Sequence, residues 1–468
     1  MSYNLLEMTP EEIKTGIVDG KITIAILGQG YIGLPLSCYL ARKGARVIGV
    51  DIDPTVVEKI NAGSPHIYEP DLKETLQVVL QKGNYHATAD VSEAIKQSEV
   101  IMITVGTPVE KTGINFSYVE RACKDVAGSM KQGCMILLRS TVAPLSTEKI
   151  VREMLERESE MVAGKDFGLA FCPERTVEGN AFKELPRLPR VIGGIDKKST
   201  DIAAAIFEVL TTKIVKVSSP RVAEMAKIFD NVYRDTNIAL ANELAVICEK
   251  LGIDVIETIK ACNTGYDRTN MLIPGAGVGG SCLNKDPYIL SYSVREKGFE
   301  PSLILSARER NISMPGHVVN LVKTAFDEMK KELNDSKITV LGFAFKSNTD
   351  DTRETVAVPI ISALKEQGAN VVVFDPYVPQ EKIESQVGKI NKANAIIETI
   401  TNSSCIVVLA DHHEFRQLNL PEIKKHLATP AAIIDGRHIF DPKEVIKEGL
   451  IFKGVGRPAS FFKELFEL

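Results

Sequence analysis

Residues 22–51 read ITIAILGQGYIGLPLSCYLARKGARVIGVD. The run at 22–27 is apolar and rich in β-branched residues, which is typical of a parallel strand covered on both faces. The turn GQGYIG follows at once, then a helical segment at 34–43 and a second apolar strand at 46–50 that ends on Asp51. This order, with an acidic residue after the second strand, predicts a dinucleotide-binding β-α-β unit.

Each glycine of the turn has a physical role in that prediction. Gly28 permits the tight turn, Gly30 lets a pyrophosphate approach the backbone, and Gly33 lets the helix pack on the strand. Asp51 is placed to accept hydrogen bonds from the adenine ribose and would repel a 2′-phosphate, so NAD is favoured over NADP. The alternative is a glycine-rich structural turn. The candidate cofactor-binding residues of this unit are Gly28, Gly30, Tyr31, Ile32, Gly33 and Asp51.

Three further apolar strands are expected at 100–105, 134–138 and 167–171. Each ends in a small or polar cluster, at the edge where open α/β sheets bind ligands. Thr141 and Glu174 are therefore candidates for the junction of cofactor and substrate. Either residue is equally well explained as a helix cap or a turn residue.

A long helix is predicted from Ser219-Pro220, a good cap and first-turn pair, to about Leu251. At 1.5 Å per residue it would be about 45 Å long, which suits a spine that joins two domains or two subunits. Lys227 and Asn231 are four residues apart and share a face of this helix. An exposed, solvated pair is the alternative to a functional one.

Cys282 lies in the sequence GVGGSCLNKD, residues 277–286. Structural cysteines usually lie in apolar runs, whereas this one lies in a polar, glycine-rich turn. The adjoining pair Lys285-Asp286 offers a cation that favours a thiolate and a carboxylate that can position water or a proton. From this stretch alone, a nucleophilic and an inert buried cysteine remain alternatives.

A second α/β series begins after the charged segment 330–335, with strands at 337–342, 371–375, 405–409 and 432–435. Its first turn, GFAFK at 342–346, lacks the GxGxxG pattern. This indicates a mononucleotide site in place of a second dinucleotide site, with Lys346 near a phosphate. Arg437 leaves the last strand at the same ligand edge.

These patterns predict an α/β protein with two Rossmann-like, doubly wound domains joined by a central helical domain that contains the long spine helix. The expected divisions are an N-terminal extension at 1–20, an NAD-binding domain at 21–217, a central helical and dimerisation domain with Cys282 at 218–330, and a second Rossmann-like domain at 331–468.

Composition narrows the class of protein. The 468 residues carry a net charge of −5, so no basic field exists for nucleic acid or anionic membranes, and neither is expected as a partner. The eight cysteines are scattered without a CxxC, which argues against a zinc cage or a disulfide framework and for a reducing compartment.

Two local patterns each allow more than one interpretation. Residues 22–41 are uncharged and long enough for a membrane helix, but their three glycines and one proline predict a strand, a turn and a helix. No targeting segment is visible, so the cytoplasm is expected. The pair His412-His413 lacks a carboxylate or thiol at ligand spacing, so a solvated loop is predicted there and no metal site.

Together the dinucleotide half, the helix with Lys227 and Asn231, the cysteine turn and the second nucleotide half resemble the UDP-glucose/GDP-mannose dehydrogenase family, the nucleotide-sugar 6-dehydrogenases. The resemblance runs from residue 21 to about 457. The motifs that carry it are GVGGSCLNKD, GFAFK, CPERTVEGNA at 172–181 and ARERNISMP at 307–315.

The resemblance implies a four-electron oxidation of a primary alcohol to a carboxylate with two NAD in succession. The C6 hydroxyl becomes an aldehyde, Cys282 attacks it to give a thiohemiacetal, and a second oxidation gives a thioester that water hydrolyses. Lys227 and Asn231 would steady the oxyanions. Asp286 would order or deprotonate the water, with Thr141 or Glu174.

The resemblance also extends the set of candidate binding residues. Further cofactor contacts are implied at Thr107, Thr141 and Lys285. A homodimer through the central helix is implied, with Arg268 as the arginine that reaches across its interface. The UDP-sugar would contact Glu174, Arg175, Lys227, Asn231, Arg268, Gly279, Lys346 and Arg437.

The sequence Pro173-Glu174-Arg175 resembles the N-acetylhexosamine members, because UDP-glucose members usually have Pro-Glu-Phe. The expected substrate is UDP-N-acetylmannosamine, ahead of UDP-N-acetylglucosamine and UDP-glucose, in polysaccharide biosynthesis. Two rival readings are a two-electron hydroxyacid dehydrogenase, which needs no cysteine, and a non-catalytic nucleotide-sugar sensor.

Overall fold

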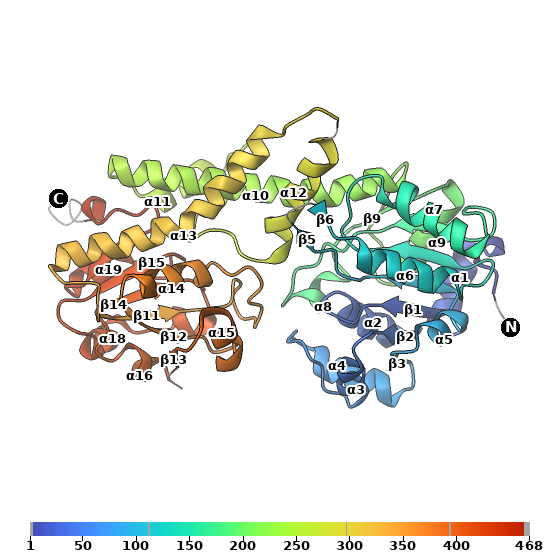
Figure 1. The fold of residues 1–468 in the computed structure, drawn as a ribbon, viewed down its shortest axis with the longest axis horizontal. Coiled ribbons are helices and arrows are strands. Elements are labelled where there is room, and N and C mark those ends of the chain that lie inside the picture. The colour runs from blue at the N-terminus through green and yellow to red at the C-terminus, as the bar shows by residue number, and fades with distance from the viewer. Residues whose placement is uncertain (1–2, 111–112, 296, 393–394, 463–468) are drawn as a thin grey trace. The chain divides into compact units, whose positions relative to one another are not determined.

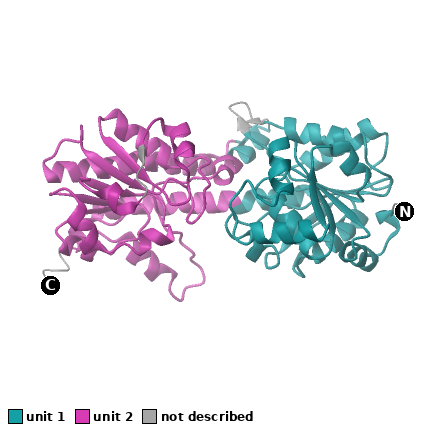
Figure 2. Cartoon of the chain, turned by 90° about the horizontal axis from the view of Figure 1, so that it is seen from below, with its two compact units in different colours: residues 1–230, 288–299 teal, residues 231–287, 300–468 magenta. Residues whose placement is uncertain are grey.

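The structure is a computed structural model that describes residues 3–110, 113–295, 297–392 and 395–462 (Figure 1). The chain divides into two compact units (Figure 2). Unit 1 comprises Met1–Asp230 and Tyr288–Phe299, and unit 2 comprises Asn231–Pro287 and Glu300–Leu468. Two helices, α10 (Pro220–Leu251) and α12 (Ser281–Arg295), contribute residues to both units.

Unit 1 is built on an eight-stranded sheet with the order β10-β9-β8-β7-β4-β1-β2-β3. Neighbouring strands are parallel except β8 and β9. Its strands are β1 (Thr23–Leu27), β2 (Arg46–Val50), β3 (Tyr85–Thr88), β4 (Val100–Ile103), β7 (Met135–Leu138), β8 (Gly168–Phe171), β9 (Arg190–Gly194) and β10 (Ile214–Lys216). The predicted doubly wound fold is confirmed, and β3, β9 and β10 are additions to the predicted strands.

Helices cover both faces of this sheet, as the continuous apolar strands required. Ile24 and Ile26 of β1 face one core, and Ala25 and Leu27 face the other. The first core is closed by α1 (Pro10–Val18), α2 (Gly33–Arg42), α4 (Leu72–Gln81) and α9 (Lys197–Glu208). The second is closed by α5 (Val91–Lys96), α6 (Ser117–Ala127) and α7 (Arg152–Ser159). Shorter elements are η1 (Leu5–Glu7), α3 (Pro54–Asn61), η2 (Thr147–Val151), α8 (Ala181–Glu184) and the hairpin β5 (Val109–Glu110) and β6 (Gly113–Ile114).

The N-terminal segment, which was expected as an extension, contributes to the core of unit 1. Thr9 and Glu12 form a capping box that starts α1. Ile13 and Ile17 of this helix are fully buried, and α1 packs against α9.

Unit 2 is built on a six-stranded parallel sheet with the order β13-β12-β11-β14-β15-β16. Val340 faces a core closed by α13 (Ser302–Met329) and α14 (Ala357–Glu366), and Leu341 faces the opposite core. The strands are β11 (Lys337–Leu341), β12 (Asn370–Phe374), β13 (Asn391–Lys392), β14 (Cys405–Val408), β15 (Ala432–Asp435) and β16 (Ile451–Gly454). The remaining helices are α15 (Gln380–Val387), α16 (Ile396–Ile400), α17 (His413–Arg416), α18 (Leu420–His426) and α19 (Pro442–Lys447).

The long helix α10 begins and ends where the sequence predicted. Asp254 caps the next helix, α11 (Val255–Asn263), by accepting a hydrogen bond from the Ile256 N–H. Two helices follow the glycines of the cysteine motif: α12, which begins at Ser281, and α13 (Ser302–Met329). None of the helices in the described ranges has the length and hydropathy needed to cross a lipid bilayer.

Candidate active site

The glycine turn after β1 has the geometry that a dinucleotide requires. Gly28 has a φ of 91°, which favours glycine, and a Cβ on Gly33 would lie 1.8 Å from the Gly28 carbonyl oxygen. A Cβ on Gly30 would meet no protein atom within 4 Å, so this backbone faces open space. The open side of Gly30 fits the approach of a pyrophosphate to the helix N-terminus.

A pocket of about 380 Å³ opens at the carboxyl ends of β1, β2 and β4 in unit 1. Gly28, Gly30 and Asp51 line it, together with Tyr118 and Arg121 of α6. No sequence motif marks Tyr118 or Arg121, so neither residue was predicted to line the site. The Asp51 carboxylate accepts a hydrogen bond from the Gln29 N–H at 2.9 Å, which joins the two strand ends. These residues fit a dinucleotide.

Tyr31 and Ile32 precede the first turn of α2 and are not among the residues that line this pocket. Ile32 is 39% exposed, and Tyr31 is half-buried. The predicted contact of these two side chains with the cofactor therefore remains a prediction.

Thr107 and Thr141, which follow β4 and β7, lie together at the same sheet edge. The Thr107 hydroxyl donates a hydrogen bond to the Thr141 carbonyl oxygen at 2.6 Å, and Thr107 is buried. Thr141 is half-buried.

Glu174 lies in a buried charge cluster with two arginines that the sequence analysis missed. Its carboxylate accepts hydrogen bonds from Arg139 Nη2 at 2.5 Å and Arg190 Nη1 at 2.8 Å. The backbone N–H groups of Arg175 and Thr176 also donate to it, at 2.7 and 2.8 Å. Burial by itself would raise the pKa of Glu174, but Arg190 and Arg139 outweigh it and lower the pKa to about 2.

This geometry changes the expected role of Glu174. A carboxylate with four donors and a low pKa is a poor proton acceptor, so the residue is better suited to fixing the loop after β8. That loop presents Arg175, whose Nε lies 2.8 Å from an Asp230 carboxylate oxygen.

Cys282 is the second residue of α12, not a member of a free turn. Its side chain is exposed, and Sγ lies 4.0 Å from the Ser281 hydroxyl. Unpaired N–H groups in the first turn of a helix favour negative charge, which suits a nucleophilic thiolate.

Asp286 follows Cys282 by one helical turn and is fully buried in unit 2. Asn231 Nδ2 donates a hydrogen bond to Asp286 Oδ2 at 2.5 Å. Asn231 and Asp286, which were assigned separate roles from the sequence, are thus in direct contact. Lys285 and Lys227 are both half-buried.

The glycines before Cys282 are required for packing against the second half of the chain. A Cβ on Gly279 would lie 2.4 Å from Phe345 Cβ, and Gly280 has a φ of 84°. The Gly280 N–H donates to the Arg353 carbonyl oxygen at 3.0 Å. Phe345 thus lies beside the Gly279 Cα, and the predicted contact of Gly279 with the UDP-sugar remains a prediction.

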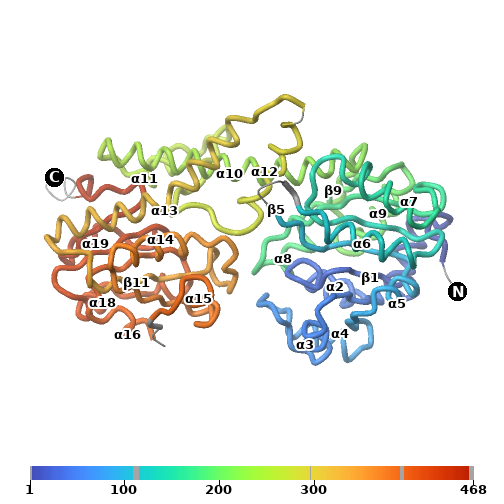
Figure 3. Tube along the Cα trace, viewed as in Figure 1, coloured from blue at the N-terminus to red at the C-terminus, as the bar shows by residue number. Residues whose placement is uncertain are grey.

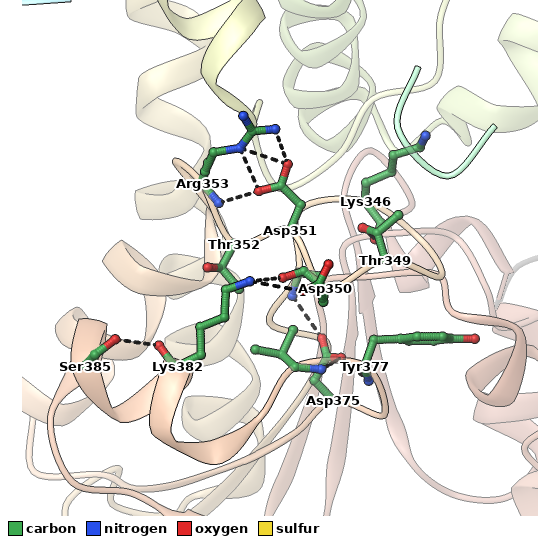
Figure 4. Close-up of polar contacts among 12 residues, drawn as sticks. Lys346, Thr349, Asp350, Asp351, Thr352, Arg353, Asp375, Tyr377, Lys382 and Ser385 are labelled. Carbon is green, nitrogen blue, oxygen red and sulfur yellow. Dashed lines mark hydrogen bonds and ion pairs between the residues drawn. The ribbon is translucent and has the colours of Figure 1, made fainter. Parts of the chain in front are cut away.

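The loop that follows β11 carries Lys346 and is held by its own acidic residues (Figure 4). Asp351 accepts hydrogen bonds from the Arg353 guanidinium at 2.6–3.0 Å, and Lys382 Nζ donates to the Asp350 carbonyl oxygen at 2.5 Å. Figure 4 shows the Lys346 side chain extending away from both pairs.

Asp411 connects Arg437 to the loop that carries Lys346. It accepts hydrogen bonds from Arg437 Nη2 at 3.0 Å, from Arg416 Nη2 at 2.9 Å and from the Ser347 hydroxyl. Burial alone would raise the pKa of Asp411, but the two arginines and Ser347 hold it below its ordinary range. Arg268 does not join this group: it is exposed, with its guanidinium 5.8 Å from the Tyr266 ring. It belongs to the segment between α11 and α12, whose backbone Figure 3 draws as a tube.

The solvated loop predicted at His412-His413 is not found: His413 is exposed but begins the short helix α17, and His412 is not solvated. His412 is fully buried, with Nε2 3.1 Å from Asp375 Oδ2, and its Nδ1 accepts a hydrogen bond from the Asn348 N–H at 2.8 Å. The Tyr377 ring packs against the His412 ring in a tilted arrangement, with the ring centroids 5.0 Å apart. Within the described ranges, no cluster of three or more His, Cys, Asp or Glu residues is arranged to hold a metal ion.

Profiles of the UDP-glucose/GDP-mannose dehydrogenase family match three parts of the chain. The NAD-binding domain matches residues 22–211, the central domain 221–313 and the UDP-binding domain 339–442. The chain belongs to this family. It is an NAD-dependent nucleotide-sugar dehydrogenase, with one domain for each nucleotide.

Relatives cover nearly the whole chain of this dehydrogenase. The UDP-N-acetyl-D-mannosamine dehydrogenase of Pyrococcus horikoshii is 37% identical over 93% of this chain and 99% of its own. The NDP-N-acetyl-D-galactosaminuronic acid dehydrogenase of Ralstonia nicotianae is 33% identical over 90% of this chain and 97% of its own.

Solved structures of nucleotide-sugar dehydrogenases are also similar to this chain over most of its length. The UDP-D-ManNAc dehydrogenase structure from Pyrococcus horikoshii is similar with a TM-score of 0.86 at 36% identity, over 94% of this chain and 100% of its own. A UDP-glucose dehydrogenase from Pyrobaculum islandicum is similar with a TM-score of 0.84 at 28% identity, over 93% of this chain and 98% of its own.

Proposed function

We propose that this dehydrogenase oxidises the C6 alcohol of UDP-N-acetyl-D-mannosamine to the carboxylate, with Cys282 as the covalent nucleophile. The observation that carries the proposal is an exposed thiol in the first turn of α12, one helical turn before the buried Asn231–Asp286 pair. The similarity to UDP-N-acetyl-D-mannosamine dehydrogenases supports the choice of sugar.

Bound NAD supplies the hydride acceptor for both oxidations. Gly28, Gly30 and Asp51 are the residues proposed to hold it, with Thr107, Thr141 and Lys285 as further contacts. The sugar nucleotide is assigned to the second half of the chain, where Lys346 and Arg437 offer cations to the diphosphate. Arg175, Gly279 and Arg268 remain proposed contacts of the sugar or its phosphates.

In the covalent stage, Cys282 Sγ forms a bond to the aldehyde carbon, and the carbonyl oxygen becomes an oxyanion. Lys227 and the second N–H of the Asn231 amide stabilise this charge. After the second oxidation the carbon is a thioester, water adds to it, and the C–S bond breaks. Asp286 takes the proton of the attacking water, and the thiolate of Cys282 is regenerated.

The first test is the number of NADH formed per sugar consumed, followed at 340 nm. UDP-N-acetyl-D-mannosamine, UDP-N-acetylglucosamine, UDP-N-acetylgalactosamine and UDP-glucose are compared, with Cys282→Ser and, as a matched control, Cys262→Ser in α11. We expect two NADH per sugar on the mannosamine substrate, lost in Cys282→Ser and kept in Cys262→Ser. One NADH per sugar, or a Cys282→Ser variant as active as the parent, would exclude the thioester route.

The proposal includes a homodimer through the central helix. Within unit 2, α10 exposes the apolar residues Tyr233, Leu240, Ile247 and Leu251, the first three at intervals of seven, and their exposed fractions are 45–66%. An exposed apolar row of this kind is typical of a helix that packs on a partner. The proposal also places the enzyme in a reducing compartment such as the cytoplasm, because Cys282 must stay a thiol.

A further inference from the structure

A chain of buried polar contacts in unit 2 connects α13 to the residues on both sides of Cys282. Arg308 of α13 is only 3% exposed. Its Nη1 donates to Asp235 Oδ1 of α10 at 2.5 Å, and its Nη2 donates to Asn284 Oδ1 at 2.5 Å. Asn284 Nδ2 in turn donates to the Val278 carbonyl oxygen at 3.2 Å.

The same network reaches the cysteine turn at a second point. Asn311 Nδ2 donates to Asp235 Oδ1 at 2.8 Å, and Asn311 Oδ1 accepts from Asn242 Nδ2 at 2.9 Å. Asn242 Oδ1 accepts from the Gly275 N–H at 2.9 Å. Three of these residues are buried, namely Asp235, Asn242 and Asn311. Water cannot readily replace their hydrogen bonds, and a buried polar group that loses its partner costs free energy.

The position of Cys282 depends on this framework because its own side chain has few constraints. It is exposed, and its Sγ lies 4.0 Å from the Ser281 hydroxyl. The direction of the thiol is therefore set by the backbone between Val278 and Asn284. The guanidinium of Arg308 is a rigid fork that bonds Asp235 and Asn284 at once, which a lysine ammonium on a flexible stem cannot reproduce.

We propose that Arg308 and Asn284 are positioning residues that hold the cysteine turn so that the thiol meets the aldehyde in a reactive geometry. This inference rests on the proposed function, because it assigns a role in the covalent stage. It predicts that loss of the contact slows the step that needs Cys282 and spares the first oxidation.

The test uses three variants of the full enzyme. Asn284→Ala removes the link to the turn and keeps the Arg308–Asp235 pair. Arg308→Lys keeps the positive charge and loses the fork. Arg310→Lys is the matched control on the same helix, where Arg310 makes an exposed ion pair with Glu243.

For Asn284→Ala and Arg308→Lys we expect kcat for the complete oxidation to fall about 10- to 100-fold, as for a reacting group displaced by about 1 Å. KM for the UDP-sugar should change less than about twofold by the same argument, since no substrate contact is removed. The NADH yield should fall from two towards one per sugar, and a hydrazide probe should trap the released aldehyde. The rate of Cys282 alkylation by iodoacetamide should also differ from that of the parent.

The alternative is that Arg308 only stabilises the core. In that case the substitutions would lower the melting temperature, but the NADH yield would stay at two and no aldehyde would be trapped. The alkylation rate of Cys282 in Asn284→Ala would equal that of the parent. That result overturns the inference. Cys282→Ser, measured alongside, separates the two levels: if it still gives two NADH per sugar, the proposed function itself fails; if it stops at one while Asn284→Ala matches the parent, only this inference fails.

Discussion

Glu174 is the residue whose structural surroundings differ most from its predicted chemistry. The sequence marks it as a carboxylate at the end of a strand, and a candidate base. Its partners Arg139 and Arg190 come from the ends of other strands and are fully buried. No sequence spacing connects these three residues, because they meet only when β7, β8 and β9 pair. The arginines keep the carboxylate ionised at neutral pH, which favours a role as an anchor over a role as a base.

Glu174→Gln should lower the free energy of unfolding by about 3 kcal/mol at pH 7, because it leaves two buried arginines without a counter-charge. Circular dichroism during urea unfolding measures this, with the exposed Glu153→Gln as the control. The pKa of Glu174 is lowered from 4.5 to about 2 on folding, so its contribution is complete above pH 4.5 and is lost as the pH falls towards 2. The stability difference between parent and variant should shrink over that window. A difference that stays constant from pH 7 to pH 3 would contradict the assignment.

Among the elements of unit 2, the loop after β14 holds the loop after β11 in place, and this second loop carries Lys346. The loop after β14 supplies His412, and the loop after β11 supplies Asn348, whose N–H donates to His412 Nδ1. Since Nδ1 accepts a hydrogen bond, the ring carries its proton on Nε2 and donates it to Asp375. Asp375 also accepts from the N–H groups of Phe343 and Ala344, in the turn that leads to Lys346. The His412–Asp375 pair thus holds the loop proposed to bind the diphosphate on both sides of Lys346.

His412→Ala should raise KM for the UDP-sugar about 10-fold, since one or two buried hydrogen bonds are lost and the loop loses its support. KM for NAD should remain unchanged, because the dinucleotide pocket lies in unit 1. Initial-rate kinetics with each substrate varied in turn provide the measurement. His413→Ala is the control, because this neighbour is exposed. Equal KM values in the two variants would remove the role assigned to His412.

In the whole molecule, each of the two sheets belongs to a domain for one of the two nucleotides. An aspartate follows the second strand of the core in both halves, Asp51 after β2 and Asp375 after β12. Asp51 is half-buried and lines an open pocket, whereas Asp375 is sealed by backbone N–H groups and His412. A ribose diol has no access to a carboxylate with that many partners. Asp375 therefore cannot take the part that Asp51 is proposed to play, and this half matches the family's UDP-binding domain.

The proposed dimer can be tested by substitutions on the exposed apolar face of α10. Leu240→Glu together with Ile247→Glu should convert a dimer to a monomer, because both side chains are about half exposed on one face of α10 and the new charges would repel. Size-exclusion chromatography with light scattering reports the change from twice the chain mass to the chain mass. Val162→Glu, at an equally exposed apolar residue of unit 1, should leave the mass unchanged. A parent enzyme that is already monomeric would exclude the interface.

Sequence alone was enough to predict the fold class, the ends of α10 and the dinucleotide turn, and to single out Cys282 as the candidate nucleophile. These features depend on local periodicity, on glycine conformation and on motifs that are contiguous along the chain. The structure alone decided which side chains meet: Glu174 with Arg139 and Arg190, His412 with Asp375, and Gly279 with Phe345. It also decided that Cys282 begins a helix. Contacts between distant segments follow from strand order and loop docking, and residue spacing carries no information about either.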